Sequence, residues 1–267
     1  MYIKIRTRSV VSRLLSVDKK ITTMIRIEIC TNGYQSVINA QENGAHCTEL
    51  CESLEVGGVT PSYGTLKKVA ADMKIPVRVL IRPRSGNYIY NDAELEMMCI
   101  DIALIKELGY EGVVIGALTE NGELDVEKIK AMMKAGEGMK FTFHRAIDAC
   151  NDPLEALKIL VDLGFDKVLT SGCRPKAVDG IDMIAKMQQQ YGDKIKIMAG
   201  GGVNVNNVKK IIDETGVSNC HASLTVDVDN YCQNLYPEKV DNTGAAMCWK
   251  VSSPSLIKEM LNIVKNS

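Results

Sequence analysis

Ile25-Arg26-Ile27-Glu28-Ile29-Cys30 alternates isoleucine with charged or reactive side chains, and this two-residue period is typical of a β-strand with one face in an apolar core. Short apolar segments recur eight times along the chain, and a helix-like stretch comes after each of them. The segments end in Glu28-Ile29-Cys30, Glu49-Leu50-Cys51-Glu52, Arg82-Pro83-Arg84, Val114-Ile115-Gly116, His144-Arg145, Thr170-Ser171-Gly172, Gly200-Gly201-Gly202 and His221-Ala222-Ser223. Polar groups at the carboxyl ends of eight successive strands predict an α/β protein with a single (β/α)₈ TIM barrel, whose site lies at the top face.

The predicted strands span residues 25–30, 47–51, 77–81, 112–117, 140–144, 167–170, 194–199 and 219–223, and a final helix spans 255–264. No G-x-G-x-x-G turn comes after the first strand, which disfavours a doubly wound, dinucleotide-binding sheet. Residues 224–254 form a long irregular loop between the eighth strand and the last helix. Loops of that length are usually functional or disordered, so we expect this one to cover the barrel mouth or to join a subunit contact.

The first 23 residues differ in composition from the rest of the chain, because they carry six basic side chains against one acid, Asp18. Such a composition resembles that of a mitochondrial transit peptide. Met24 stands immediately before the first strand, which favours an appended tail or a start codon set too early. We therefore expect residues 1–23 to be disordered or outside the native fold, and residues 24–267 to form the barrel domain.

The composition argues against several function classes. The net charge is −1 and no basic patch is interleaved with aromatic residues, so no nucleic-acid partner is expected. No apolar run approaches about 18 residues, so no membrane span is expected. The nine cysteines are scattered and form no Cys-x-x-Cys pair, which fits neither a disulfide framework nor a zinc ribbon. They predict free thiols in a reducing compartment.

Strand alternation predicts that Glu28 and Cys30 share the inner face of the first strand, and that Glu49 and Cys51 share the inner face of the second. A buried carboxylate needs a partner, because an unpaired buried charge is costly. Arg82-Pro83-Arg84 offers two guanidinium groups, which also suit the capture of a carboxylate or phosphate ligand. A structural glutamate–arginine network and a ligand-binding site remain equally open here.

Cys30 and Cys51 lie at the ends of adjacent predicted strands and could form a two-thiolate metal site. Soft thiolates favour Cu(I) or Zn(II), and two thiolates suffice for linear Cu(I). Zinc would need two more ligands, for which His144 or His221 could serve. The alternative interpretation is a pair of buried thiols.

His144 ends the fifth predicted strand and is a candidate general acid or base. Asp148, four residues later, could orient this histidine or cap the segment after it. His221, on the eighth strand, is a weaker candidate of the same kind. The alternative for each histidine is a structural hydrogen-bonding role.

The glycine-rich turn Gly200-Gly201-Gly202 comes after the seventh predicted strand, and Ser171-Gly172 comes after the sixth. Barrels often bind phosphate with the loops after strands seven and eight, where backbone N–H groups and hydroxyls act as donors. These residues therefore form a candidate anion loop. Glycines also occur simply where the chain must turn sharply, and that alternative stays open.

Seven motifs, taken together, resemble the CutC copper-homeostasis family. They are Glu28-Ile29-Cys30, Glu49-Leu50-Cys51, Gly57-Gly58-Val59-Thr60-Pro61-Ser62, Ile81-Arg82-Pro83-Arg84, Thr142-Phe143-His144-Arg145-Ala146, Leu169-Thr170-Ser171-Gly172 and Met198-Ala199-Gly200-Gly201-Gly202-Val203. The resemblance implies a cytoplasmic, usually oligomeric TIM barrel that is associated with copper tolerance, with copper bound by Cys30 and Cys51. The family's first strand often ends in two successive cysteines, whereas this chain has Thr31 at the second position.

Two main hypotheses result. The first is a Cu(I)-binding homo-oligomer that buffers or delivers copper through Cys30 and Cys51. The second is an enzyme acting on a small anionic or phosphorylated metabolite, in which Arg82, Arg84 and the glycine turn 200–202 hold the anion. In that enzyme His144 or Glu49 would move a proton and Asp148 would orient the histidine. A scaffold that has lost activity is the third and least attractive interpretation, because so many ionisable groups share one face.

Overall fold

The structure is a computed structural model, and it describes residues 24–228 and 249–265. The prediction made for residues 1–23 lies outside the described residues, as does most of the long loop after the eighth strand. Within the described part, no helix combines the length and the apolar character that crossing a membrane requires.

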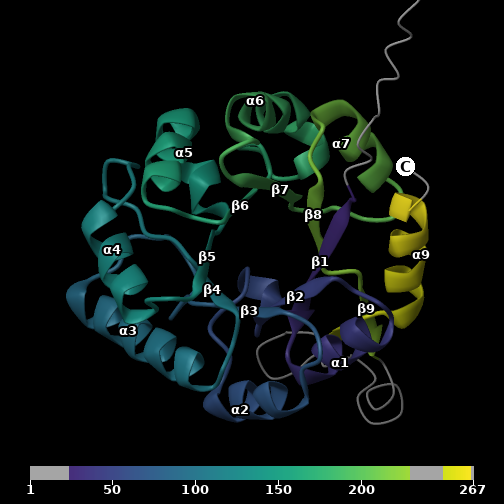
Figure 1. Cartoon of the computed structure of the whole chain (residues 1–267), viewed down its shortest axis with the longest axis horizontal. Helices are drawn as coiled ribbons and strands as arrows, with labels where there is room; N and C mark the ends of the chain where they lie inside the picture. The colour runs from purple at the N-terminus through teal and green to yellow at the C-terminus, as the bar shows by residue number, and fades with distance from the viewer. Residues whose placement is uncertain (1–23, 229–248, 266–267) are drawn as a thin grey trace, which may run out of the picture.

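Eight parallel strands close into a barrel in chain order (Figure 1). They are β1 (Arg26–Asn32), β2 (Cys47–Cys51), β3 (Val77–Leu80), β4 (Gly112–Ile115), β5 (Lys140–Phe143), β6 (Lys167–Thr170), β7 (Lys196–Gly200) and β8 (Asn219–Ala222). The barrel is closed because β8 pairs with β1 as well as with β7. This arrangement confirms the predicted TIM barrel.

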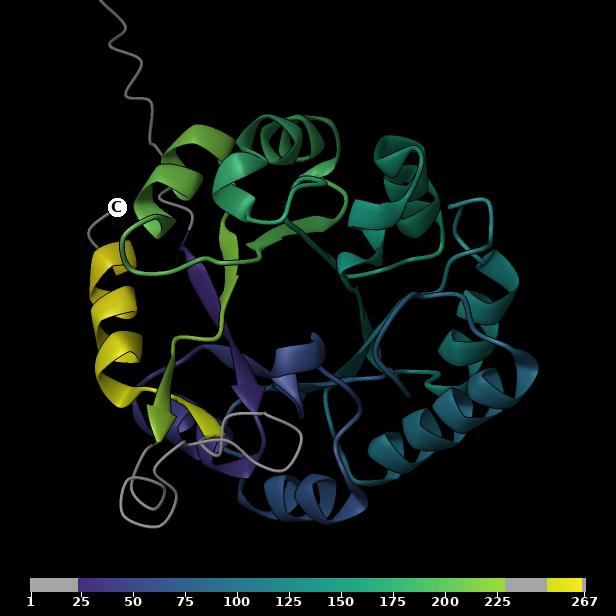
Figure 2. The same cartoon turned by 180° about the vertical axis from the view of Figure 1, so that it is seen from behind.

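Helices form a ring around the barrel, and α9 completes the ring between α7 and α1 (Figures 1 and 2). The α-helices are α1 (Tyr34–Glu42), α2 (Tyr63–Asp72), α3 (Asp92–Glu107), α4 (Val126–Ala135), α5 (Pro153–Asp162), α6 (Ile181–Tyr191), α7 (Val208–Thr215) and α9 (Pro254–Lys265). Three 3₁₀ helices, η1 (Leu54–Val56), η2 (Arg145–Ala149) and η3 (Ala177–Asp179), lie in the loops after β2, β5 and β6.

Local sequence determines where several of these helices begin. At the start of α3 the Asn91 side chain accepts a hydrogen bond from the backbone of Glu94, while the Glu94 carboxylate accepts one from the backbone of Asn91. This reciprocal capping box satisfies two donors that the first helical turn leaves without partners. Asp125 and Asp152 cap α4 and α5 in a related way, with their side chains accepting hydrogen bonds from backbone N–H groups of the first helical turn.

The connection after β8 is not wholly irregular. Two further strands, β9 (Thr225–Val228) and β10 (Trp249–Ser252), pair antiparallel, and Val226 lies opposite Val251. Asn32 at the end of β1 donates a hydrogen bond to the carbonyl of Lys250, which ties this small sheet to the barrel. The prediction of an irregular segment over 224–254 is therefore wrong at both of its ends, where β-branched residues favour paired strands.

Apolar side chains fill the layer between the barrel and its helices. Ile27 and Ile29 of β1 are fully buried in one apolar cluster with Val37 of α1. Because successive side chains of a strand point to opposite faces, Glu28 and Cys30 turn toward the barrel interior. The helix-facing isoleucines thus determine which residues of β1 reach the site.

Charged side chains occupy the middle of the barrel interior. Glu28 and Lys167 are both buried, and their carboxylate and ammonium groups are 2.6 Å apart. β1 and β6 are not neighbours, so this ion pair spans the interior. Arg78 of β3 donates to Thr142 and to Asp166, each at 2.5 Å. A barrel interior is usually filled with apolar side chains, so these paired charges are an unusual feature of this chain.

Lys167, and neither of the candidate partners Arg82 and Arg84, pairs with Glu28, so the structure does not favour a glutamate–arginine network for this carboxylate. Lys167 is the first residue of β6 and reaches Glu28 at the middle of the barrel, whereas both arginines come after the end of β3, nearer the mouth. The lysine holds the pKa of the Glu28 carboxyl far below its ordinary value of 4.5, although burial acts in the opposite direction.

We expect Lys167→Met to lower the free energy of unfolding at neutral pH by about 3 to 5 kcal/mol, because it leaves the carboxylate of Glu28 buried without its main counter-charge. Lys196→Met is the matched control: this lysine pairs with Asp166 at the surface, and its loss should cost about 0 to 1 kcal/mol. Urea unfolding of the three proteins measures both effects. Equal losses in the two variants would contradict the importance of the buried pair.

The stability of the wild-type protein relative to Lys167→Met has a defined pH dependence. The folded protein keeps Glu28 ionised at pH values where the unfolded chain protonates it, because its folded pKa is lowered. Its contribution is therefore complete above pH 4.5 and declines as the pH falls below that value. The difference in stability between wild type and Lys167→Met should narrow over the same range.

Candidate functional site

A cavity of about 470 Å³ opens at the carboxyl ends of the barrel strands. Its polar lining includes side chains from strand ends or the loops after them: Cys30, Glu49, Cys51, Arg82, His144, Arg145 and His221. The cavity is as large as the pockets that hold small organic ligands. Its position agrees with the top-face site that the sequence predicted.

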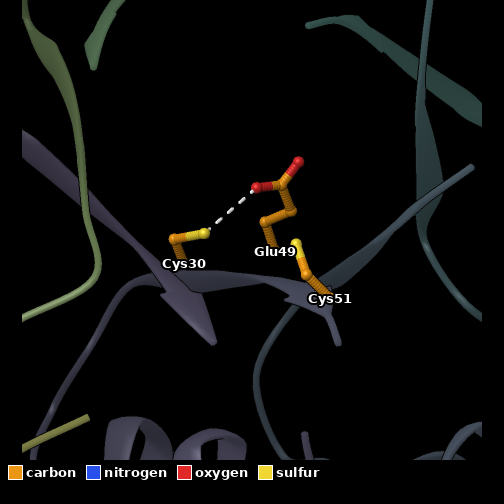
Figure 3. Close-up of side chains that lie close together, drawn as sticks. All are labelled: Cys30, Glu49 and Cys51. Carbon is orange, nitrogen blue, oxygen red and sulfur yellow. Dashed lines mark hydrogen bonds between the residues drawn. The ribbon is translucent and has the colours of Figure 1, made fainter. Parts of the chain in front are cut away.

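Two thiols and a carboxylate meet on the β1–β2 side of this cavity. Cys30 of β1 lies opposite Glu49 of β2 in the strand register, and Cys51 lies two residues later on the same face. Figure 3 shows the three side chains converging, with the Cys30 sulfur 3.5 Å from Oε2 of Glu49. One ligand atom from each residue lies within 4.8 Å of the others, which is close enough for a single metal ion.

His221 of β8 connects this group to the middle of the barrel. Its Nδ1 lies 3.1 Å from Oε1 of Glu28, and its Nε2 lies 3.2 Å from Oε2 of Glu49. Burial disfavours the charged ring, but the nearby Cys30, Glu28 and Glu49 side chains outweigh it and raise the pKa of His221 well above its ordinary value. These contacts favour the protonated ring, which can donate to a carboxylate on each side.

The two thiols of the pair have opposite acidities. The hydrogen bond from Cys51 lowers the pKa of Cys30, and the charge of His221 contributes in the same direction. Burial, together with that same hydrogen bond, raises the pKa of Cys51 well above its ordinary value. Cys30 is therefore the more acidic thiol of the two, and a soft metal ion can replace a thiol proton when it binds.

His144 and Arg82 lie on the other side of the cavity, at the ends of β5 and β3. The Nδ1 atom of His144 accepts a hydrogen bond of 3.2 Å from the backbone N–H of Ala146, and its buried Nε2 has no protein partner. Burial, assisted by the charge of Arg82, lowers the pKa of His144 to about 3, so the ring is neutral at physiological pH. The Arg82 guanidinium donates to the backbone carbonyls of Val56, Gly58 and Gly86.

Three of the residues predicted to be catalytic do not line the cavity. Glu28 lies beneath it, where it meets His221 and Lys167. Arg84 is turned toward Glu94 of α3, with which it forms an ion pair. Asp148 accepts hydrogen bonds from the hydroxyl and the backbone N–H of Ser171 and does not touch His144. The prediction that Asp148 orients the histidine is corrected accordingly, because the loop after β6 uses both of its oxygens.

The predicted anion loop is divided by the structure. Gly201 and Gly202 line the cavity, whereas Ser171, Gly172 and Gly200 do not. Gly201 and Gly202 have φ values of 101° and 72°, a backbone region that glycine adopts without strain. A side chain at position 200 would come within 2.4 Å of Leu169. Backbone geometry therefore accounts for this run of glycines, and its binding of an anion stays a prediction.

The sequence patterns do not indicate a role for three residues in or directly beneath the cavity. Lys167 stood out only as the start of a predicted strand, and Tyr88 lies in an irregular loop whose sequence carries no pattern. Arg145 belonged to a motif but had no assigned role, yet it lines the cavity and pairs with Asp148 at 3.0 Å. His221 is more central than its strand-end position alone indicates. The closure of the barrel pairs β8 with β1, and the register places His221 opposite Glu28.

The chain is similar to known proteins along most of its length. The model of the CutC family matches residues 25–226. A CutC family protein of Glaesserella parasuis is 44% identical to this chain, over 90% of this chain and 99% of the relative. The copper homeostasis protein cutC homolog of Homo sapiens is 42% identical, over 74% of this chain and 72% of the relative. The crystal structure of a CutC protein from Streptococcus agalactiae, 36% identical, superposes with a TM-score of 0.71 over 75% of this chain and 99% of that chain.

The pKa values of the two cavity histidines should be shifted in opposite directions from the ordinary value of histidine. The sequence contains only three histidines, so their ring signals can be resolved by nitrogen–proton NMR and assigned with a His46→Gln variant. We expect His221 to stay doubly protonated through neutral pH, because its pKa is raised well above its ordinary value, and His144 to stay neutral down to pH 5, because its pKa is lowered to about 3. A neutral His221 at pH 7 would contradict this description of the site.

Proposed function

The chain belongs to the CutC family, and we propose that it is a copper-homeostasis protein that binds Cu(I) through the thiolates of Cys30 and Cys51. The observation that carries the proposal is the convergence of these two sulfurs and the Glu49 carboxylate within 4.8 Å at the cavity wall. Copper is the cargo in this proposal, and the protein buffers or delivers it.

The donor set fits Cu(I) better than the other soft candidate, zinc. Soft thiolates are the preferred ligands of Cu(I). With metal–sulfur bonds of roughly 2.3 Å, two sulfurs on opposite sides of one ion lie about 4.6 Å apart. The ligand atoms of this cluster lie within 4.8 Å of one another, so binding would need only local adjustment of the two side chains. Zinc needs four ligands, and both ring nitrogens of His221 are already engaged with carboxylates.

The access and acidity of the pair also support loading with a metal ion. Cys30 is partly exposed and Cys51 is buried, and both line the cavity. Metal binding displaces the proton of a thiol ligand, so copper affinity should rise with pH.

We further propose that the protein acts in the cytoplasm and forms a homo-oligomer. The described cysteines are free, which suits a reducing compartment and a site that depends on reduced thiols. On α3 the side chains of Met97 and Ile100 are about half or more exposed, beside a surface hollow that Pro61 and Pro83 also line. This apolar surface is suited to a contact between copies of the chain.

A second candidate function is an enzyme that acts on a small anionic metabolite. One observation favours it: copper on the thiols would occupy only the β1–β2 wall, while the cavity also exposes groups of His144, Arg82 and Arg145. In this candidate Glu49 or His144 would transfer the proton.

The double variant Cys30→Ser, Cys51→Ser should lose copper binding, because it removes both soft ligands. Native mass spectrometry of protein prepared under reducing conditions with one equivalent of Cu(I) measures the bound metal. We expect wild type to retain one ion and the double variant to retain none. Cys47→Ser, Cys220→Ser is the matched control. These two cysteines lie on β2 and β8 but outside the cluster, so this variant should bind one copper ion like wild type. Retention of the ion by the Cys30, Cys51 variant would refute the proposed site.

A further inference from the structure

We propose that Arg82 and His144 form an oxyanion-binding subsite at the mouth of the barrel, which takes the carboxylate or phosphate group of a small organic molecule. The subsite lies at the ends of β3 and β5, whereas the thiols lie on β1 and β2. The inference is therefore independent of copper binding, and it would hold if Cys30 and Cys51 bound no metal.

The first observation is the uncompensated charge of Arg82. Only 5% of the surface of this residue is exposed, and among the described residues its guanidinium donates to three backbone carbonyls and to no side chain. Its Nε is buried without a partner, and no carboxylate of the described residues forms an ion pair with it. Burying a charge without a counter-charge costs several kcal/mol, so a bound anion would stabilise this arrangement.

Neighbouring arginines do not share this property. Arg84 is neutralised by Glu94, and Arg145 is neutralised by Asp148. Arg78, deeper in the barrel, is paired with Asp166. Among these arginines of the described barrel interior and mouth, Arg82 is thus the one whose charge is left for a ligand.

The second observation is the unpaired ring nitrogen of His144. Because Nδ1 accepts from Ala146, the neutral ring carries its proton on Nε2, which is buried without a partner in a residue that lines the cavity. Gly116 packs against the ring: a side chain there would lie 2.4 Å from the imidazole Cε1. The ring is therefore held in place by this packing, and its Nε2 donor is left without a partner among the described residues.

Tyr88 joins the two donors into one wall. Its ring centroid lies 4.7 Å from that of His144, and the guanidinium carbon of Arg82 lies 5.4 Å from the same tyrosine ring. Arg82 and His144 offer only hydrogen-bond donors here, because the acceptor nitrogen of His144 is already used. A wall made of donors and a positive charge is complementary to a carboxylate or phosphate, whose oxygens act as acceptors.

The rest of the cavity points to an organic ligand. Its volume of about 470 Å³ far exceeds that of one oxyanion group, and Leu54, Leu80, Leu169 and Val203 contribute apolar lining. Pockets of this size with a few convergent polar groups are typical sites for small molecules. The ligand class is therefore a small organic carboxylate or phosphate ester with a partly apolar body.

Titration of the wild-type protein with benzoate, phenyl phosphate and the neutral benzamide tests the proposal directly. Calorimetry gives each affinity, and the Nε2–H signal of His144 in the NMR spectrum reports contact with the subsite. We expect at least one of the two anions to bind saturably and to shift that signal, with benzamide at least about tenfold weaker. The stronger of the two anions identifies the group as carboxylate or phosphate. No saturable binding of either anion, or equal binding of benzamide, would overturn the proposal.

Variants separate the subsite from the rest of the mouth. His144→Gln and Arg82→Lys should each weaken the anion by about tenfold or more, while Arg84→Gln, a matched arginine paired elsewhere, should bind like wild type. If Arg82→Lys fails to fold because its carbonyl contacts are lost, His144→Gln and the wild-type NMR shift still decide the outcome.

The Cys30→Ser, Cys51→Ser variant should keep its anion affinity, so failure of the copper proposal and failure of this one are distinguishable. Unchanged binding in His144→Gln would contradict the assignment.

Discussion

The carboxylate of Glu28, held between Lys167 and His221 in the middle of the barrel, organises the network beneath the site. Two positive groups meet one buried negative group, at 2.6 Å and 3.1 Å. Burying these ions is tolerated only because each has a partner. Glu28 contributes to the raised pKa of His221, and the His221 ring in turn lies against Glu49 and contributes to the lowered pKa of the Cys30 thiol.

The cavity above this network has two walls of different chemistry. The wall formed by β1 and β2 offers soft, anionic ligands, whereas the wall at the ends of β3 and β5 offers N–H donors and the charge of Arg82. A cation fits the first wall and an oxyanion fits the second. Copper binding would account for the thiols of the first wall only. It would not account for the donors of Arg82 and His144 on the second wall, for which we propose a separate anionic ligand.

Much of the fold and part of the site could be predicted from local sequence. Alternation placed Glu28 on the inner face of β1 and set Cys30 and Cys51 on the same side of neighbouring strands, because strand periodicity depends on residues only a few positions apart. The pairing of Glu28 with Lys167 was not predictable, since 139 residues separate them and their meeting depends on the diameter and stagger of the closed barrel. Proximity in sequence misled for Asp148, which lies close to the end of β5 but faces the loop after β6 through the turn of η2.

X-ray absorption spectroscopy at the copper edge, on the protein loaded with one equivalent of Cu(I), would show directly whether the thiols hold the metal. We predict a first shell dominated by two sulfur atoms, as the geometry of Cys30 and Cys51 allows. A first shell of nitrogen or oxygen atoms alone would contradict this, because copper would then be bound away from the thiols.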